Sequence, residues 1–404
     1  MKRAGSFERF TVMACLVAGG EAIYTLPYFL RRDYANSLTG ALGVSQTELG
    51  TLSALFGIVA MLSYFPGGWL ADRIPTRLLF TGSLLATAVG GFAFAALPGY
   101  PGALAVFGFW GISTILTFWA ALIKAARMWG GARQQGRAFG ILDGGRALLG
   151  AVFGTVALAL FDLFATERAG LRAVIMFYSC LNVAVAAAAW WRLPVQDEQV
   201  ERAPGVTSLG LLRLPAVWLH AAVIFCAYSA YWGTYNLAGF AADGYGLGAS
   251  KAAGVSVFGT WFGPPAAIGA GFLVERFGAG RVVMLSLLIM AAALALLAAV
   301  PPVSATVGLL WVNAAMACGA AFALRGTYYA LLEDGGIPTA LTGSAVGFVS
   351  VVGYSPDIFI PTLTGLLVDG FEGGTGYRIL FGVLAGLCIV GAWSARNVVR
   401  WARS

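Results

Sequence analysis

The chain contains the stretch Gly68-Trp69-Leu70-Ala71-Asp72-Arg73, which is followed a few residues later by Arg77. A similar stretch, Gly271-Phe272-Leu273-Val274-Glu275-Arg276, is followed by Arg281 and begins about half a chain length later, in a protein of 404 residues. Each stretch ends one long apolar segment and precedes another. A charged turn at matching places in the two halves indicates an internally duplicated helical membrane protein.

The composition is that of a chain that lies mostly within a membrane. Hydrophobic residues make up 59% and charged residues 11%, whereas soluble domains carry about 25% charged residues. Apolar runs long enough to cross a bilayer of about 30 Å are separated by short polar gaps. We expect twelve spans, at 9–30, 46–70, 77–98, 102–126, 136–161, 170–191, 211–236, 251–274, 281–300, 304–331, 340–367 and 375–396.

These runs predict an all-α integral membrane fold of two pseudo-symmetric six-helix bundles. Residues 1–191 are expected to form the N-terminal bundle, 192–210 a polar linker, and 211–404 the C-terminal bundle. Lys and Arg concentrate on one side of the spans, which places both termini and the linker in the cytoplasm. The expected location is therefore the inner (plasma) membrane, and the net charge of +7 needs no nucleic-acid partner.

The two charged stretches resemble the hinge motif of the major facilitator superfamily, Gly-x-Leu-Ala-Asp-Arg-x-Gly-Arg-Arg, between its second and third helices. In the first half the matching residues are Gly68, Asp72, Arg73 and Arg77. In the second half they are Gly271, Glu275, Arg276 and Arg281, with Glu in place of Asp and one extra residue before the last Arg. The resemblance implies alternating access of two bundles around a central cavity, with these residues at the gating hinge.

A narrower resemblance concerns residues 325–357. The segments 325–333, 342–347 and 353–357 are similar to a bacterial branch that is distantly related to organic-anion and sugar-phosphate antiporters. Sugar-phosphate antiporters carry phosphate-binding arginines in their first and seventh helices, where this chain has Glu21 and His220. A phosphate ester is therefore not the expected substrate.

Arg146, in the middle of the fifth expected span, is the first candidate for a substrate site. A charge inside a span costs about 2.5–3.5 kcal/mol on insertion scales, so its presence needs a reason. Its planar guanidinium matches a carboxylate, and transporters of this kind bind substrates near the membrane midplane. The alternative is a structural ion pair with Glu21 or Asp143.

Arg325 and Lys124 occupy comparable places in the two halves and are further candidates for binding an anion. Lys124 can instead extend to the membrane surface. Glycines spaced by four, such as Gly140 with Gly144 and Gly150 with Gly154, allow close helix packing.

Four titratable residues are candidates for proton coupling, namely Glu21, Asp143, His220 and Asp357. Glu21 either exchanges a proton or forms a permanent pair with Arg146. Asp357 either is a second proton site or pairs with Arg325. His220 is the only histidine, and a packed histidine is a more common role than a proton switch.

The seventh span carries an aromatic face formed by Tyr228, Trp232 and Tyr235, and Asn236 follows it. The spacing of the three rings puts them on one side of a helix. They either line a pocket for an apolar part of the substrate or belong to the aromatic belt at the membrane surface.

The expected function is secondary active transport of a small organic anion or zwitterion, by symport with protons or by antiport. Two alternatives remain open from the sequence: a transporter of an amphipathic neutral solute, and a transporter-like membrane sensor that moves nothing. The sequence shows no catalytic set, metal cluster or phosphate loop, so we expect neither an enzyme nor a cofactor or metal. The expected partners are a small-molecule substrate, protons or a counter-anion, and the lipid bilayer, for a protein that acts as a monomer.

Overall fold

The computed structural model describes residues 6–71, 73–130, 135–194, 215–331 and 349–401. These residues form helices and connecting turns, and none of them lies in a β-strand. Twelve helical segments are long and apolar enough to cross a membrane, at the places where the hydrophobic runs predict them. The all-α membrane fold expected from the sequence is therefore confirmed.

The chain divides into two compact units, Met1–Glu201 and Arg202–Ser404. Six of the twelve segments belong to each unit. The boundary between the units falls within the predicted linker at 192–210, most of which lies outside the described residues.

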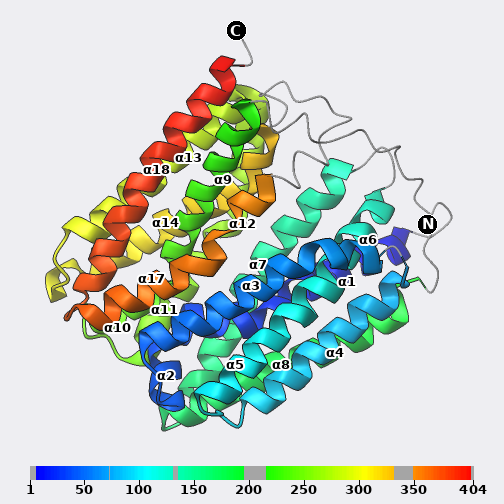
Figure 1. Cartoon of the computed structure of the whole chain (residues 1–404), viewed down its shortest axis with the longest axis horizontal. Coiled ribbons are helices and arrows are strands. Elements are labelled where there is room, and N and C mark those ends of the chain that lie inside the picture. The colour runs from blue at the N-terminus through cyan, green and yellow to red at the C-terminus, as the bar shows by residue number, and fades with distance from the viewer. Residues whose placement is uncertain (1–5, 72, 131–134, 195–214, 332–348, 402–404) are drawn as a thin grey trace. The chain divides into compact units, whose positions relative to one another are not determined.

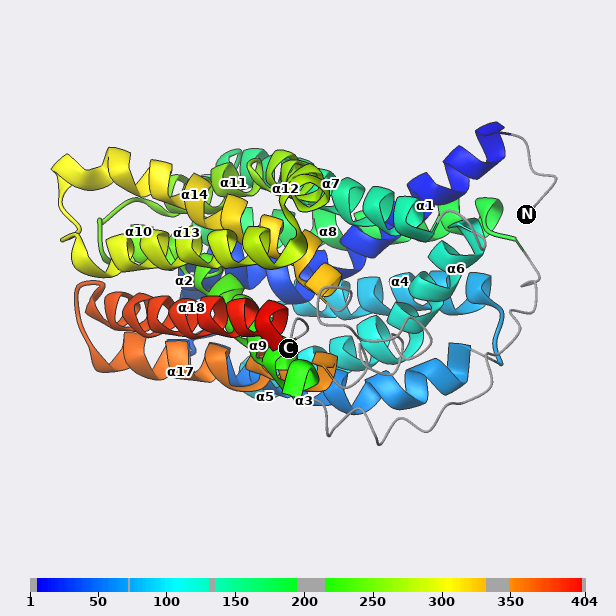
Figure 2. The same cartoon turned by 90° about the horizontal axis from the view of Figure 1, so that it is seen from above.

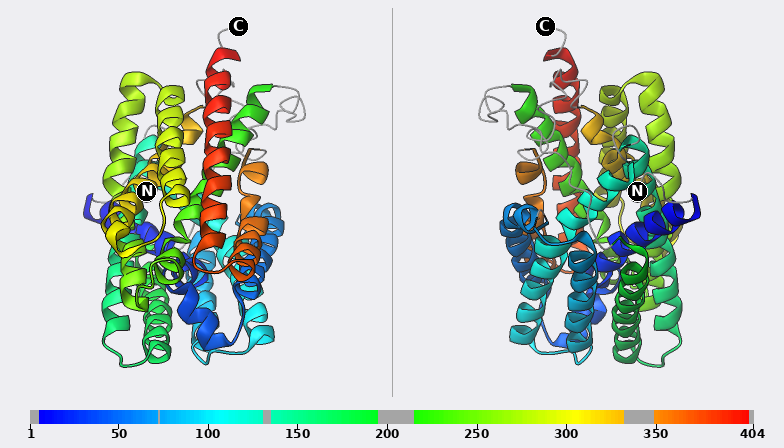
Figure 3. Two further views of the ribbon diagram at one scale, coloured as in Figure 1. Left: turned by 90° about the vertical axis from the view of Figure 1, so that its left-hand side faces the viewer. Right: turned by 90° about the vertical axis from the view of Figure 1, so that its right-hand side faces the viewer.

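The first unit begins with one continuous helical segment, in which α1 (Ser6–Tyr24) passes through the π-helical turn η1 (Thr25–Phe29) into α2 (Leu30–Leu42). A second π-helical turn, η2, joins α5 to α6 in the same way. α4 packs along α8, and α1 packs against both α7 and α8, so that the helices of this unit run lengthwise beside one another (Figures 1 and 3). The remaining elements are α3 (Gln46–Ala71), α4 (Thr76–Phe94), α5 (Tyr100–Gly111), η2 (Ile112–Trp119), α6 (Ala120–Gly130), α7 (Gln135–Asp162) and α8 (Glu167–Arg192).

In the second unit α18 packs along α9 and α13, and α12 packs along α14. Figure 2 shows α18, in red, beside α13. The described elements are α9 (Pro215–Thr234), α10 (Leu237–Asp243), α11 (Ala249–Thr260), α12 (Gly263–Phe277), α13 (Ala279–Ala299), η4 (Ser304–Thr306), α14 (Val307–Thr327), η5 (Tyr328–Ala330), α17 (Pro356–Gly370) and α18 (Thr375–Trp401).

The two units pair their helices in the same way. The third and sixth segments pack together as α4 with α8 and as α13 with α18, and the first and sixth as α1 with α8 and as α9 with α18. The second and fourth segments are paired as α3 with α5 and as α12 with α14. This repeated pairing is the structural counterpart of the duplicated sequence signature.

The first segment is longer than the sequence predicts. The run expected at 9–30 continues as helix to Leu42, so Arg31 and Arg32 lie buried in α2 and not in a connecting loop. Arg32 forms a bidentate pair with Asp33, with Nε–Oδ1 and Nη2–Oδ2 distances of 2.7 and 2.8 Å. The loop assignment was wrong because hydropathy scores each charge separately, whereas a paired and hydrogen-bonded arginine can be buried.

Candidate functional site

Arg146, near the middle of α7, forms a buried ion pair in the first unit. Its Nε lies 3.3 Å from Oε2 of Glu21 on α1, and its Nη1 lies 3.5 Å from Oδ1 of Asp143 one turn earlier. The exposed fractions of the side chains are 9% for Arg146, 13% for Glu21 and 63% for Asp143. Both predicted acidic partners are therefore present, and Glu21 is the one that is buried together with the arginine.

Two aromatic rings lie beside the same guanidinium. The Cζ atom of Arg146 is 5.6 Å from the ring centre of Tyr24 and 5.9 Å from that of Trp119. Aromatic faces attract cations, so these rings stabilise the charge without neutralising it. Tyr24 was missed in the sequence, where its only signal was a spacing of three residues from Glu21 on the same helix.

Glycine makes room for this ion pair between α1 and α7. A Cβ atom at Gly150 would lie 2.5 Å from Oε1 of Glu21, and one at Gly20 would lie 3.1 Å from Cδ of Arg146. Packed interiors do not absorb such short contacts without a shift. The close approach predicted from glycine spacing is confirmed at Gly150, whereas a Cβ at Gly144 would meet nothing within 4 Å.

A second polar cluster, in the second unit, contains the predicted residues Arg325, Asp357, Trp232 and Tyr235. Arg325, on α14, donates from Nη1 to the hydroxyl of Tyr231 at 3.0 Å, and this hydroxyl lies 3.2 Å from that of Tyr235. Asp357, at the start of α17, accepts a hydrogen bond from Trp232 Nε1 at 2.8 Å. The rings of Trp232 and Tyr235 are in contact, with centroids 4.8 Å apart, so the cluster is continuous.

Two rings of the predicted aromatic face, at and just after the end of α9, are buried. Trp232 and Tyr235 are only 3% and 5% exposed, and the ring of Tyr228 packs edge-on against Tyr354 with centroids 4.8 Å apart. Rings of a membrane-surface belt face lipid headgroups, so burial favours the interpretation in which these rings line a protein interior. Asn236 has a local role as well, because its Nδ2 donates to the backbone carbonyl of Trp232 at 2.9 Å.

Tyr354 connects further tyrosines that the sequence analysis missed. Its hydroxyl lies 3.0 Å from that of Tyr328 and 2.9 Å from that of Tyr329, and the Tyr329 hydroxyl lies 3.0 Å from Ser350 Oγ. His220 is 1% exposed and its ring centre is 6.3 Å from that of Tyr329. This position fits the interpretation of His220 as a packed core residue.

Lys124, on α6, has a structural contact. Its Nζ donates to the backbone carbonyl of Ala71, the last residue of α3, at 2.8 Å. The last carbonyls of a helix have no donor within the helix, so Lys124 caps α3. The predicted role of Lys124 in binding an anion stays a prediction.

The predicted hinge residues of the first unit lie near the end of α3 and the start of α4. Arg73 donates from Nη1 to the carbonyl of Trp69 at 3.2 Å and stacks 4.0 Å from the centre of that ring. Arg77 lies 4.1 Å from the ring centre of Trp190 on α8. Gly68 lies within α3, and Asp72 lies outside the described residues.

In the second unit the hinge turn is formed by Gly278, whose φ of +83° is readily adopted only by glycine. It joins α12 to α13 at the position where the hinge motif has its own glycine, and the extra residue of this copy lies between Gly278 and Arg281. The side chain of Arg276 lies 5.3 Å from the ring centre of Phe277. Four predicted hinge residues lie on these two helices, and all of them are exposed: Gly271, Glu275, Arg276 and Arg281.

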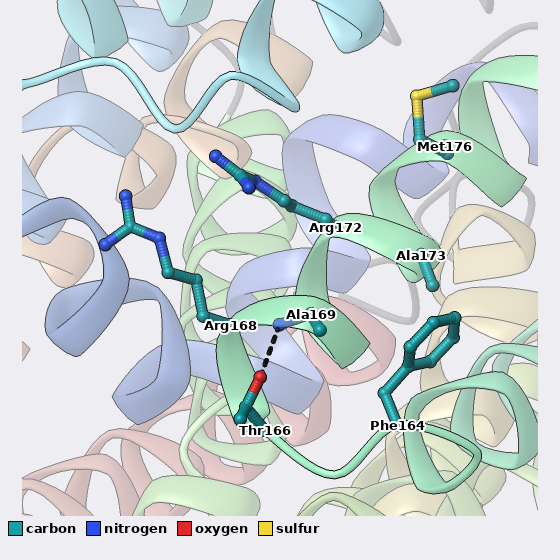
Figure 4. A pocket seen from close by; sticks show the side chains of 7 residues that line it. All are labelled: Phe164, Thr166, Arg168, Ala169, Arg172, Ala173 and Met176. Carbon is teal, nitrogen blue, oxygen red and sulfur yellow. Dashed lines mark hydrogen bonds between the residues drawn. The ribbon is translucent and has the colours of Figure 1, made fainter.

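A surface pocket of about 390 Å³ lies at the turn between α7 and α8 (Figure 4). The side chains of Arg168 and Arg172 extend to the same side, away from Phe164 and Met176 (Figure 4). α7 ends at Asp162, about 24 Å along the helix from Arg146. The pocket lies beyond this end. Its lining residues are Phe164, Thr166, Arg168, Ala169, Arg172, Ala173 and Met176, and none of them belongs to the Arg146 cluster.

Twelve membrane-spanning helices in two units with the same helix pairing, each with an arginine among aromatic rings, define a two-repeat membrane transporter. The sequence model of the Major Facilitator Superfamily matches residues 10–361, and the chain belongs to this family. The resemblance seen in the hinge motif is thereby confirmed.

Two proteins of Escherichia coli K12 are similar to the chain over nearly its whole length. "Inner membrane protein YihN" is 28% identical over 410 residues, which cover 95% of this chain and 94% of the relative. "Inner membrane protein YqcE" is 26% identical over 406 residues, which cover 96% of this chain and 93% of the relative. Together with the twelve apolar helices, these relatives support a multi-pass protein of the inner membrane.

Solved structures show the same fold. A bacterial homolog of the human lysosomal transporter Spinster superposes with a TM-score of 0.75 at 16% identity and covers 98% of each chain. The nucleoside transporter NupG superposes with a TM-score of 0.74 at 15% identity, covering 97% of this chain and 98% of its own. Family and fold together support secondary transport as the class of function, while substrate choice depends on the site.

Proposed function

We propose that the protein moves a small organic anion or zwitterion across the inner membrane by alternating access, coupled to protons or to exchange of a counter-anion. The observation that carries this proposal is the buried pair of Arg146 and Glu21, 3.3 Å apart and bordered by Tyr24 and Trp119. The distribution of Lys and Arg supports an orientation with both termini in the cytoplasm.

Arg146 supplies the group that recognises an anion. A guanidinium stays protonated in proteins and presents a planar fork that fits a carboxylate. A buried charge needs a counter-charge at every stage, so Arg146 must exchange one acidic partner for another when the substrate binds. Glu21 is the partner that is displaced, and the rings of Tyr24 and Trp119 favour the cation throughout the exchange.

The need to keep the charge of the site balanced would couple anion binding to proton uptake or to exchange of a second anion. Replacing ionised Glu21 by a substrate carboxylate and a protonated Glu21 leaves the net charge around Arg146 and Asp143 unchanged. A substrate anion that entered while Glu21 stayed ionised would leave an unbalanced negative charge in a site of low exposure. The anion and a proton would therefore be taken up together, or one anion would replace another.

The second unit offers the other polar groups of the proposed mechanism. Arg325 and the hydroxyls of Tyr231 and Tyr235 form a linked set of donors within that unit, and we propose them as a second place where the chain can bind a carboxylate. Asp357, which accepts from Trp232 Nε1 at 2.8 Å, is the second titratable candidate.

A neutral amphipathic solute is the second candidate substrate, and the ion pair itself favours it. Because Arg146 and Glu21 balance each other, an apolar solute could pack on Tyr24 and Trp119 with both charges left in place. The two candidates differ in whether the ligand needs Arg146.

A ligand-stabilisation screen of the purified full-length protein separates them. Carboxylates, amino acids, short peptides, sugar phosphates and neutral sugars are tested at two pH values on wild type, on Arg146→Ala and on Arg172→Ala. Arg172 is the matched control, because it is an exposed arginine of the same unit that lines the surface pocket. The proposal predicts a carboxylate that raises the Tm of wild type and Arg172→Ala but not of Arg146→Ala. Stabilisation only by neutral compounds, unchanged in Arg146→Ala, would overturn it.

A further inference from the structure

The π-helical turn η1 follows directly on the residues that contact Arg146. Ala22, the residue after Glu21, lies in the last turn of α1 and is fully buried. A backbone carbonyl has two lone pairs and can accept from side chains as well as from the helix backbone. The carbonyl of Ala22 does so.

Two side chains donate to the carbonyl of Ala22. Thr25 Oγ1, in the turn itself, donates to the Ala22 carbonyl at 2.6 Å. Asn182 Nδ2, from α8, donates to the same carbonyl at 2.9 Å and also to the carbonyl of Tyr178 in its own helix at 2.9 Å. Asn182 is fully buried and thus ties α8 to the backbone of α1 one residue after Glu21.

The position of Ala22 determines the direction of Glu21. A π-helical turn holds an extra residue, which rotates the side chains on its two sides by about 100° relative to an α-helix. Glu21 and Tyr24 lie immediately before this turn, and both contact Arg146. Glu21 also has little free space, because a Cβ atom at Gly150 would already lie 2.5 Å from its Oε1.

We propose that Asn182 is a positioning residue for the ion pair of Glu21 and Arg146. By donating to the carbonyl of Ala22, it fixes the backbone next to Glu21 and aims Glu21 at the guanidinium. The inference rests on the proposed function for its role in transport, and the geometry that it describes can be tested without any substrate.

A double-mutant cycle on the full-length protein in detergent tests this role. The lowering of Tm caused by Glu21→Gln is measured in wild type, in Asn182→Leu and in Asn313→Leu. Asn313, on α14, is a matched control because it is also buried and its Nδ2 donates to the backbone carbonyl of Ala293 at 3.0 Å. Both substitutions remove a buried hydrogen bond, but only one lies beside Glu21.

If Asn182 positions Glu21, the Tm loss from Glu21→Gln is roughly halved in Asn182→Leu and unchanged in Asn313→Leu, since residues that act together are not additive. Equal losses in all three backgrounds would overturn the proposal. Should Asn182→Leu fail to fold, Asn182→Ser keeps a polar group that is too short to reach α1, and the same cycle with this variant decides.

A second arm uses succinate as the probe and compares the concentration that gives half of the maximal Tm increase. The proposal expects this concentration to fall, by about tenfold at most, in Asn182→Leu, because a misplaced Glu21 competes less with the anion for Arg146, and to stay unchanged in Asn313→Leu; an unchanged or higher concentration in Asn182→Leu would count against it. If no carboxylate of the screen stabilises wild type, the proposed function fails, and the cycle still decides the positioning role by itself.

Discussion

A Cβ atom at Gly150 would lie 2.5 Å from Oε1 of Glu21, while Oε2 of the same carboxylate is 3.3 Å from Nε of Arg146. Gly150 and Arg146 lie one turn apart on α7, so that helix offers open space and a positive charge on the same face. Glu21 on α1 fills this space. The absence of a side chain at Gly150 is thus part of the ion-pair geometry.

Gly150→Ala should disturb the pair by pushing on Glu21. Overpacking a filled interior costs about 1–3 kcal/mol, so we expect a lower Tm. Gly144→Ala, on the same helix, is the control, because a Cβ atom there would meet nothing within 4 Å. Thermal unfolding of the two variants checks this prediction, and an unchanged Tm in Gly150→Ala would contradict it.

Neutralising one partner of the pair should harm stability more than neutralising both. Arg146→Gln removes the buried counter-charge of Glu21, and Glu21→Gln leaves Arg146 with the exposed Asp143, in a site where Arg146 and Glu21 are only 9% and 13% exposed. Breaking a fully buried pair costs about 3–5 kcal/mol, and we expect a value near the lower end here. The double variant should unfold at a higher temperature than either single variant. If the lowering of Tm in the double variant equals the sum of the two single lowerings, the two residues do not form a direct pair.

Asp357 allows its charge and its hydrogen bond to be separated. In Asp357→Asn the side-chain oxygen can still accept from Trp232 Nε1, whereas Asp357→Leu leaves this buried donor without its acceptor, at a cost of about 1–3 kcal/mol. We expect a near-normal Tm for the first variant and a lowered Tm for the second. If Asp357 is a proton site, transport by Asp357→Asn should lose its pH dependence, and an unaltered pH profile would remove this residue from the mechanism.

Lys124→Met should act on the end of α3 and not on anion binding. Its Nζ donates to the Ala71 carbonyl at 2.8 Å, and losing a helix-capping contact costs about 0.5–2 kcal/mol. We expect a modest loss of Tm, with the carboxylate concentration for half-maximal stabilisation changed by less than about twofold. A weakening as large as that of Arg146→Ala would instead place Lys124 in the binding site.

Much of the fold could be predicted from the sequence because membrane spans are set by local composition. A bilayer imposes one length and one polarity on every span, so hydropathy located all twelve segments. Hydropathy did not predict that Arg31 and Arg32 are buried in a helix, because it does not register contacts between side chains. The bidentate pair of Arg32 with Asp33 is one such contact. The repeat was visible because the hinge motif is short, charged and present twice.

In the first unit the candidate site was predicted only where an isolated charge marked it. Arg146, Glu21 and Asp143 stood out as charges within apolar runs, and the structure brings them together. Tyr24 and Asn182 were not found, since an aromatic ring or an amide in a membrane helix is common and its partner lies on another helix. The hydrogen bond from Asn182 to the Ala22 carbonyl joins two helices far apart in the sequence, so no local pattern shows it.

The most direct test measures proton uptake on anion binding. Purified protein in weakly buffered solution with a pH indicator receives the carboxylate identified by the stabilisation screen, and wild type is compared with Glu21→Gln. Because the site keeps its net charge, we predict uptake of about one proton per bound anion in wild type and none in Glu21→Gln. Anion binding without proton uptake in wild type, or the same uptake in both proteins, would contradict the exchange of Glu21 for substrate at Arg146.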